Sequence, residues 1–208
     1  MTTQAQVHSA EHVHRDDLGA RLGMWLFLFT ELILFGGMFL VYSVYRFSHP
    51  QEFHIAAKEL NTIVGTFNTM ILLTSSLTMV LSIAAIQRDN KKLSIFFQFL
   101  TILLAVFFMV NKFFEWSVKF HHGIYPGSET LLNEKSGDIL FFGLYYVMTG
   151  LHGLHVLVGI VIIAVMMRFT SKGVVTHDNY IKLENTGLYW HLVDIIWIFL
   201  FPLFYLIT

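Results

Sequence analysis

Cysteine is absent from this 208-residue sequence, and charged residues are scarce, at 13%. Without cysteine the chain has no disulfide, no thiolate metal site and no cysteine nucleophile. A soluble domain carries about 25% charged residues, so this chain has roughly half the usual share. The net charge of −1 provides no basic surface, and we therefore expect no nucleic-acid partner.

Apolar residues are abundant instead. They make up 55% of the chain, phenylalanine alone occurs 21 times, and the mean hydropathy is +0.63. One small core cannot bury that much apolar surface, so the composition indicates a protein that lies in lipid. The polar stretch "MTTQAQVHSAEHVHRDDLGA" at the start lacks a basic region followed by an apolar one, so we do not expect a cleavable signal peptide.

Five segments are long and apolar enough to cross a bilayer, which takes about 20 residues in a helix. Irregular backbone and open sheet edges are excluded from hydrocarbon, so each segment is expected to be a helix. The sequence therefore predicts an all-α membrane protein with five transmembrane helices in a single bundle. The predicted parts are a polar tail (1–20) and a transmembrane domain (21–208) with helices at about 21–47, 61–87, 93–120, 137–169 and 187–207.

Basic residues near the helix ends predict the orientation, because they are enriched on the cytoplasmic side. One side carries eight of them: Arg15, Arg21, Arg88, Lys91, Lys92, Arg168, Lys172 and Lys182. The other side carries five: Arg46, Lys58, Lys112, Lys119 and Lys135. We therefore expect a cytoplasmic N-terminus and a periplasmic C-terminus.

Ionisable residues within the predicted spans are candidate functional groups, because they are costly in hydrocarbon. They are Glu31, Lys112, Glu115, His152, His155, His191 and Asp194. Glu31 lies about 15 Å into its helix, near the middle of the bilayer. Burial disfavours the charged form of an unpaired carboxylate. Glu31 is thus either a neutral group hydrogen-bonded to a neighbouring helix or a group that exchanges protons with a pathway.

Two further pairs have a spacing of three residues, which places both members on one face of a helix. Lys112 and Glu115 lie near the outer end of the third span, where we expect a snorkelling interfacial pair or an anchor for a lipid headgroup. His191 and Asp194 could form a structural clasp between helices or a proton relay. A hydrolase is not expected there, because no nucleophile accompanies the pair.

His152 and His155 also share one face, in "GLHGLHVLVG". Two such histidines could bind a metal or a haem. Haem ligation between helices needs a second histidine at the same depth, and His191 lies near the inner end of its helix whereas His155 is roughly 20 Å from that side. The neighbouring glycines favour the other interpretation, hydrogen bonding across a tight helix interface.

Four stretches together resemble subunit III of the haem-copper terminal oxidases. They are "LFLFTELILFGGMFLVYSVYR", "FFEWSVKFHHGIYPGS", "YYVMTGLHGLHVLVG" and "YWHLVDIIWIFLFPLFY". Each stretch alone is weak evidence for the family, but the four in this order and at this spacing are specific for it. The resemblance extends from about residue 21 to the end of the chain.

The resemblance implies an accessory subunit without haem, copper or a catalytic residue of its own. Its partners would be subunit I, which holds the haem and copper, other oxidase subunits and bound phospholipid. It would support oxygen reduction and proton pumping in a bacterial cytoplasmic membrane, with cytochrome c or quinol as an indirect donor. Glu31 matches the family's buried carboxylate that reacts with hydrophobic carbodiimides, and His152, His155, His191 and Asp194 fall on its characteristic polar positions. Longer members of the family have seven spans, with a lipid cleft between the first two and the other five. This chain has five spans, so we expect its lipid cleft to be incomplete.

Two other functions are kept as rivals. A small proton-coupled transporter using Glu31 would be expected to show inverted repeats or broken helices, and the sequence has neither. A di-histidine haem protein would need His152 or His155 as a ligand. In the tail, His8, His12 and His14 could buffer protons near an uptake path, or the tail could simply be disordered.

Overall fold

The computed structural model describes residues 17–133 and 135–207, so His8, His12 and His14 lie outside the described residues. Its five long helices are α1 (Asp17–Ser48), α3 (Thr62–Gln87), α4 (Lys91–His121), α6 (Ser136–Ser171) and α7 (Ile181–Tyr205). Each has the length and composition to cross a membrane, which confirms the expectation of five spans. Several helices extend past the predicted apolar segments. Helix α7 begins at Ile181 rather than near residue 187, because its first turns carry polar residues that do not belong to the apolar segment.

Side-chain caps set the starts of two spans. The side chain of Asn61 accepts hydrogen bonds from the backbone N–H groups of Ile63 and Val64 at the start of α3. Asn90 accepts in the same way from Leu93 at the start of α4. These contacts satisfy N–H groups that have no partner within their own helix. The α3–α4 turn is therefore short and well defined, with Asp89 in the left-handed region at φ 56°.

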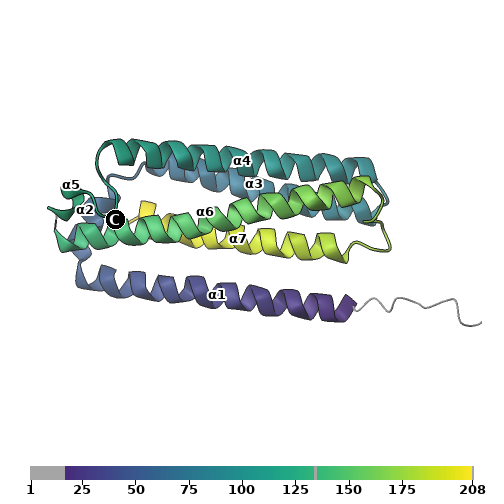
Figure 1. Ribbon diagram of the computed structural model, residues 1–208, viewed down its shortest axis with the longest axis horizontal. Coiled ribbons are helices and arrows are strands. Elements are labelled where there is room, and N and C mark those ends of the chain that lie inside the picture. The colour runs from purple at the N-terminus through teal and green to yellow at the C-terminus, as the bar shows by residue number, and fades with distance from the viewer. Residues whose placement is uncertain (1–16, 134, 208) are drawn as a thin grey trace, which may run out of the picture.

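Two short helices lie in the connections at one end of the molecule: α2 (Pro50–Ala57) and α5 (Glu129–Leu132). We call this end, which also holds Tyr205, the C-terminal end. The opposite end, with Asp17, the 88–90 turn and the 172–180 loop, is the N-terminal end (Figure 1). Phe53 of α2 is fully buried against Tyr42 and Phe141, so α2 closes the bundle over this end.

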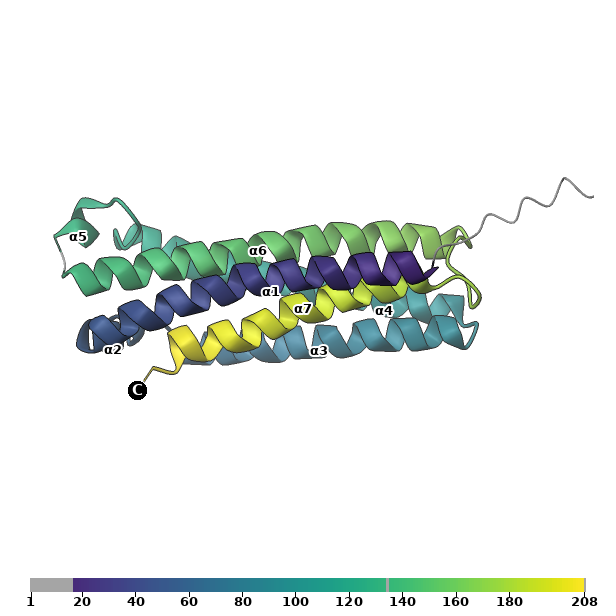
Figure 2. The same cartoon turned by 90° about the horizontal axis from the view of Figure 1, so that it is seen from below.

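Helices α3, α4, α6 and α7 form a four-helix bundle, and α1 runs along one side of it against α6 and α7 (Figures 1 and 2). Small residues let the bundle helices approach closely. A Cβ atom on Gly159 would lie 2.7 Å from the ring of Trp190, and one on Gly65 would lie 2.8 Å from the rings of Phe201 and Tyr205. These two glycines therefore place α7 against α6 and α3.

Large side chains fill the centre of the bundle, and polar pairs join its helices. Trp190 and Trp197 of α7 are completely buried. Near the N-terminal end, hydroxyl and amide groups meet between helices, for example Thr78 with Thr101 at 2.7 Å. Polar contacts of this kind associate helices in lipid, where hydrophobic burial alone drives little association.

Candidate functional site

The carboxylate of Glu31 meets an imidazole from another helix. Its Oε2 lies 2.9 Å from Nε2 of His155, which α6 contributes. Both side chains are 14% exposed, and Glu31 lies near the middle of the 32-residue α1. The ring of Phe35 packs edge-on against His155. The structure thus gives the mid-helix carboxylate an interhelical partner 124 residues away in sequence.

The second ring nitrogen of His155 indicates which tautomer of the imidazole fits this contact. Nδ1 lies 2.8 Å from the backbone carbonyl of Leu151, which can only accept, so Nδ1 carries a proton. Nε2 then either accepts a proton from a neutral Glu31 or, in imidazolium, donates one to ionised Glu31. In both states the Glu31–His155 contact contains one shared proton and the pair has no net charge. This geometry can hold or pass a proton without leaving an isolated charge in the membrane.

A pocket of about 410 Å³ opens beside the pair, between α1, α6 and α7. Tyr189 lines it and donates a hydrogen bond to the backbone carbonyl of His155 at 3.0 Å. Asn185 also lines it, and its side-chain oxygen has no hydrogen-bond partner among the described residues. The other walls are mostly apolar: Met24, Phe27, Leu154, Val158 and Ile162. A polar floor with apolar walls suits an amphipathic molecule or an apolar chain.

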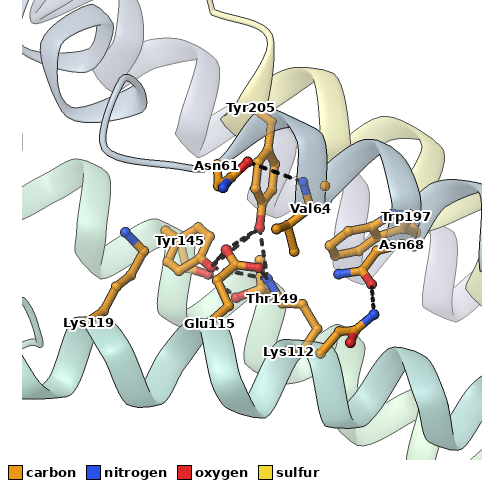
Figure 3. Close-up of polar contacts among 12 residues, drawn as sticks. Asn61, Val64, Asn68, Lys112, Glu115, Lys119, Tyr145, Thr149, Trp197 and Tyr205 are labelled. Atoms are coloured by element: carbon orange, nitrogen blue, oxygen red, sulfur yellow. Dashed lines mark hydrogen bonds and ion pairs between the residues drawn. The ribbon is translucent and has the colours of Figure 1, made fainter.

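A second polar cluster lies toward the C-terminal end and joins α4, α6 and α7 (Figure 3). The ammonium group of Lys112 donates to Glu115 at 3.1 Å, to the Tyr145 hydroxyl at 3.1 Å and to the Tyr205 hydroxyl at 2.9 Å. Both hydroxyls donate to Oε1 of Glu115, at 2.6 Å from Tyr145 and 2.5 Å from Tyr205. Lys112 therefore has three acceptors, and the Glu115 carboxylate has three donors.

The position of Lys112 corrects the expectation of a snorkelling pair. Lys112 is only 7% exposed, and its ammonium lies 5.2 Å from the ring centre of Trp197 in the bundle. The side chain points inward because two tyrosines and Glu115 supply acceptors there and an aromatic face supplies further cation–π attraction. The cluster thus clasps three helices.

The remaining candidates are not brought together into one site. His191 contacts Ser76 of α3, with 2.6 Å between Nδ1 and the hydroxyl oxygen, and has no hydrogen bond to Asp194. Asp194 is 3% exposed, and neither of its carboxylate oxygens has a hydrogen-bond partner among the described residues. His152 is 1% exposed and lies between the rings of Phe108 and Trp197. Neither of its ring nitrogens has a hydrogen-bond partner among the described residues.

Neither histidine of the His152–His155 pair belongs to a metal-binding group. The described residues contain no cluster of three or more histidine, aspartate or glutamate side chains arranged to hold a metal. The helical spacing placed the two histidines on adjacent positions, but His155 turns toward α1 and His152 toward the ring of Trp197 on α7.

Sequence reasoning missed several residues of the second cluster. Tyr145 and Tyr205 were not singled out, although they supply the hydroxyls that hold Glu115. Asn111 donates from its side chain to Asn68 of α3 at 2.9 Å, next to this cluster, and was also missed. The available signal was the presence of amide and phenol groups within apolar helices, where polar atoms need partners.

Comparison with known proteins assigns the chain to a family. The family model of cytochrome c oxidase subunit III matches residues 2–208. A cytochrome c oxidase subunit 3 from Thermostichus vulcanus is 30% identical over 99% of this chain and 96% of its own length. A probable quinol oxidase subunit 3 from Staphylococcus saprophyticus is 29% identical, over 90% of this chain and 88% of its own.

A third relative is a longer protein. The haem-copper oxidase subunit I+III of Aeropyrum pernix is 29% identical over 90% of this chain, which corresponds to 22% of that protein. The family match covers both the Glu31–His155 pair and the Lys112–Glu115 cluster. Together with the five spans, it establishes that the chain belongs to the cytochrome c oxidase subunit III family.

Proposed function

We propose that this chain is a cofactor-free accessory subunit of a bacterial respiratory terminal oxidase and binds to subunit I in the cytoplasmic membrane. Subunit I would hold the haem and copper that reduce oxygen to water and would pump the coupled protons. The family match over residues 2–208 is the single observation that carries this proposal. The Aeropyrum pernix relative supports the contact with subunit I, because its name describes the two subunits as one chain.

The experiment is purification of the complex through an affinity tag on this chain. We expect subunit I to co-purify with a haem spectrum and oxygen-consuming activity. An isolated chain without subunit I or haem would contradict the proposal. Reduction with cytochrome c and with a quinol in parallel identifies the donor, for which the Staphylococcus saprophyticus relative makes a quinol oxidase the second candidate.

Within this role, the Glu31–His155 pair is proposed to hold a proton that supports proton uptake or the stability of turnover. The 2.9 Å contact between Glu31 and His155, the contact of His155 Nδ1 with the Leu151 carbonyl and the adjoining 410 Å³ pocket support this assignment. A Glu31→Gln variant keeps the shape and can donate to His155 but cannot ionise. We expect it to lower proton uptake or to shorten sustained turnover of the complex. If both stay at wild-type values, only the interhelical contact remains as the role of Glu31.

The remaining polar candidates are proposed as interhelical groups, and the pocket beside Glu31 as a site for phospholipid. Lys112, Glu115, His152, His191 and Asp194 are all on bundle helices. We expect their substitution to lower the stability of the complex more than its turnover rate per intact complex. A loss of turnover in a fully assembled complex would instead indicate a direct role.

The N-terminal end is proposed to face the cytoplasm, on the basis of the distribution of basic residues. The absence of native cysteine allows a direct test. Single-cysteine variants Lys91→Cys and Lys58→Cys lie at opposite ends of the bundle. In intact cells, an impermeant maleimide should label position 58 and spare position 91; the reverse pattern would invert the topology.

A further inference from the structure

A cavity lies between α3 and α4 at the C-terminal end of the molecule, away from α1 and from the pocket beside Glu31. It has a volume of about 370 Å³, within the range of roughly 300–1,000 Å³ typical of ligand pockets. Its polar lining consists of Glu59, Asn61, Asn111, Glu115 and Lys119. In Figure 3, Asn61 lies just before the start of α3, while Glu115 and Lys119 project from α4. The cavity is therefore built from residues of both helices at the C-terminal end.

Lys119 is a buried cation with few hydrogen-bond acceptors among the described residues. It is 6% exposed, and within the described chain its ammonium makes one hydrogen bond, 3.4 Å long, to the backbone carbonyl of Glu59. The rings of Phe142 and Tyr145 lie 5.4 and 6.0 Å from it. An ammonium has three N–H donors, so two remain for an acceptor inside the cavity. Lys112, two turns earlier on the same face of α4, already uses all three of its donors.

The two carboxylates of the cavity differ in how far they are neutralised. Glu115 already accepts from Lys112, Tyr145 and Tyr205. Glu59 lies just after α2 at the exposed rim of the cavity. The cavity therefore offers one under-coordinated ammonium inside and one carboxylate at its mouth. A ligand with an anionic group followed by a primary ammonium complements both.

An apolar surface continues from the cavity toward the middle of the bilayer. Phe114 lines the cavity, and Val110 and Phe107 follow it on the same face of α4. Phe67 of α3 lies beside them, with its ring centre 6.1 Å from that of Phe107. All four side chains are between 42% and 63% exposed, so this surface is open to acyl chains.

We propose that this cavity binds a phospholipid with a phosphoethanolamine headgroup from the leaflet at the C-terminal end. Lys119 binds the phosphate, Glu59 accepts hydrogen bonds from the primary ammonium, and the acyl chains lie along Phe114, Val110 and Phe107. A choline headgroup has no N–H to donate to Glu59. A headgroup with net negative charge leaves Glu59 uncompensated and close to the phosphate.

The test is lipid binding to the purified, delipidated oxidase complex by native mass spectrometry. Phosphatidylethanolamine, phosphatidylcholine and phosphatidylglycerol are titrated separately. In the Lys119→Met complex, we expect phosphatidylethanolamine to bind the site about tenfold more weakly, because one hydrogen bond to a charged group is lost. Lys119→Arg, which keeps the charge, should retain binding. Glu59→Gln should remove the preference for ethanolamine over choline.

Lys58→Met is the matched control, because it removes an exposed lysine at the same end that does not line this cavity. It should leave the binding of all three lipids unchanged. Equal binding of phosphatidylethanolamine in the Lys119→Met and wild-type complexes would overturn the proposal. So would equal wild-type occupancy by the choline lipid, displacement by inorganic phosphate alone, or no binding because another subunit covers the cavity.

Discussion

Helices α1 and α7 both have the length to cross a membrane, but they are packed very differently. In the most apolar part of α7, 56% of the residues are buried, against 11% in α1. Helix α7 packs against α3, α6 and α1, whereas α1 lies along one side of the bundle (Figure 2). The apolar residues of α7 are thus used within the chain, while most of those on α1 remain for lipid or a neighbouring subunit.

Polar contacts compensate for the small apolar contact area of α1. They occur at three heights along the helix: Arg21 with Glu184 at 2.9 Å, Glu31 with His155 at 2.9 Å, and the Tyr42 hydroxyl with the backbone carbonyl of Leu203. Only the first is well exposed. The comparison shows that α1 is held by single polar contacts and single ring contacts such as Phe39 with Phe199, whereas the bundle is held by extensive packing together with a buried ionic cluster.

Breaking the ionic cluster of the bundle should have the largest effect. Lys112→Met leaves the Glu115 carboxylate buried without its counter-charge, and loss of one partner of a buried pair costs ~3–5 kcal/mol. Unfolding of the purified chain in mixed detergent micelles, followed by circular dichroism, measures the loss. A Lys112→Met/Glu115→Gln double variant removes both charges and should recover part of it. A loss below about 1 kcal/mol would mean that the pair behaves like an exposed one.

Adding one methyl group at a glycine should affect stability differently in the bundle and in α1. Gly159→Ala places a Cβ atom 2.7 Å from Trp190, and overpacking of this kind costs ~1–3 kcal/mol. Gly36→Ala on α1 meets nothing within 4 Å, and alanine favours a helix over glycine by ~1 kcal/mol. We therefore expect destabilisation from the first and no loss from the second in the same unfolding assay. Equal losses would mean that α1 is packed as tightly as the bundle.

Removing the middle contact of α1 should have a smaller, local effect. Glu31→Leu leaves Nε2 of His155 without its partner, and the loss of one hydrogen bond at this partly exposed site costs ~1 kcal/mol. Faster hydrogen exchange in the middle of α1, with α7 unchanged, is the expected readout. Glu31→Gln should keep wild-type exchange. Reaction with a hydrophobic carbodiimide should be abolished in both, and labelling that persists would place the reactive carboxylate elsewhere.

The smallest effect is expected at the N-terminal end of α1. The side chains of Arg21 and Glu184 are 48% and 35% exposed, and exposed ion pairs contribute ~0.2–1 kcal/mol. Arg21→Ala should therefore change the unfolding free energy by less than 1 kcal/mol. The difference should vanish at high salt, which screens exposed charges. A larger or salt-independent loss would show that α1 depends on this contact more than on Glu31.

Much of the fold could be predicted because the relevant signal is local. Each span shows its apolar length within its own segment, and the Asn61 and Asn90 caps precede the helices that they start. The choice of Glu31 as a buried polar group needed only its position within an apolar run. The direction of Lys112 could not be predicted, because it depends on Tyr145 and Tyr205, which are 33 and 93 residues away.

The sequence by itself determined that the chain lies in a membrane, that it has five helices long enough to span it and which polar groups lie within them. The reason is that the cost of placing residues in hydrocarbon is summed along each segment, without reference to the others. Only the tertiary structure decided that Glu31 meets His155, that Lys112 turns inward and that Lys119 has a single acceptor among the described residues. Those outcomes depend on which helix faces a side chain at a given depth, and helix spacing alone does not contain that information.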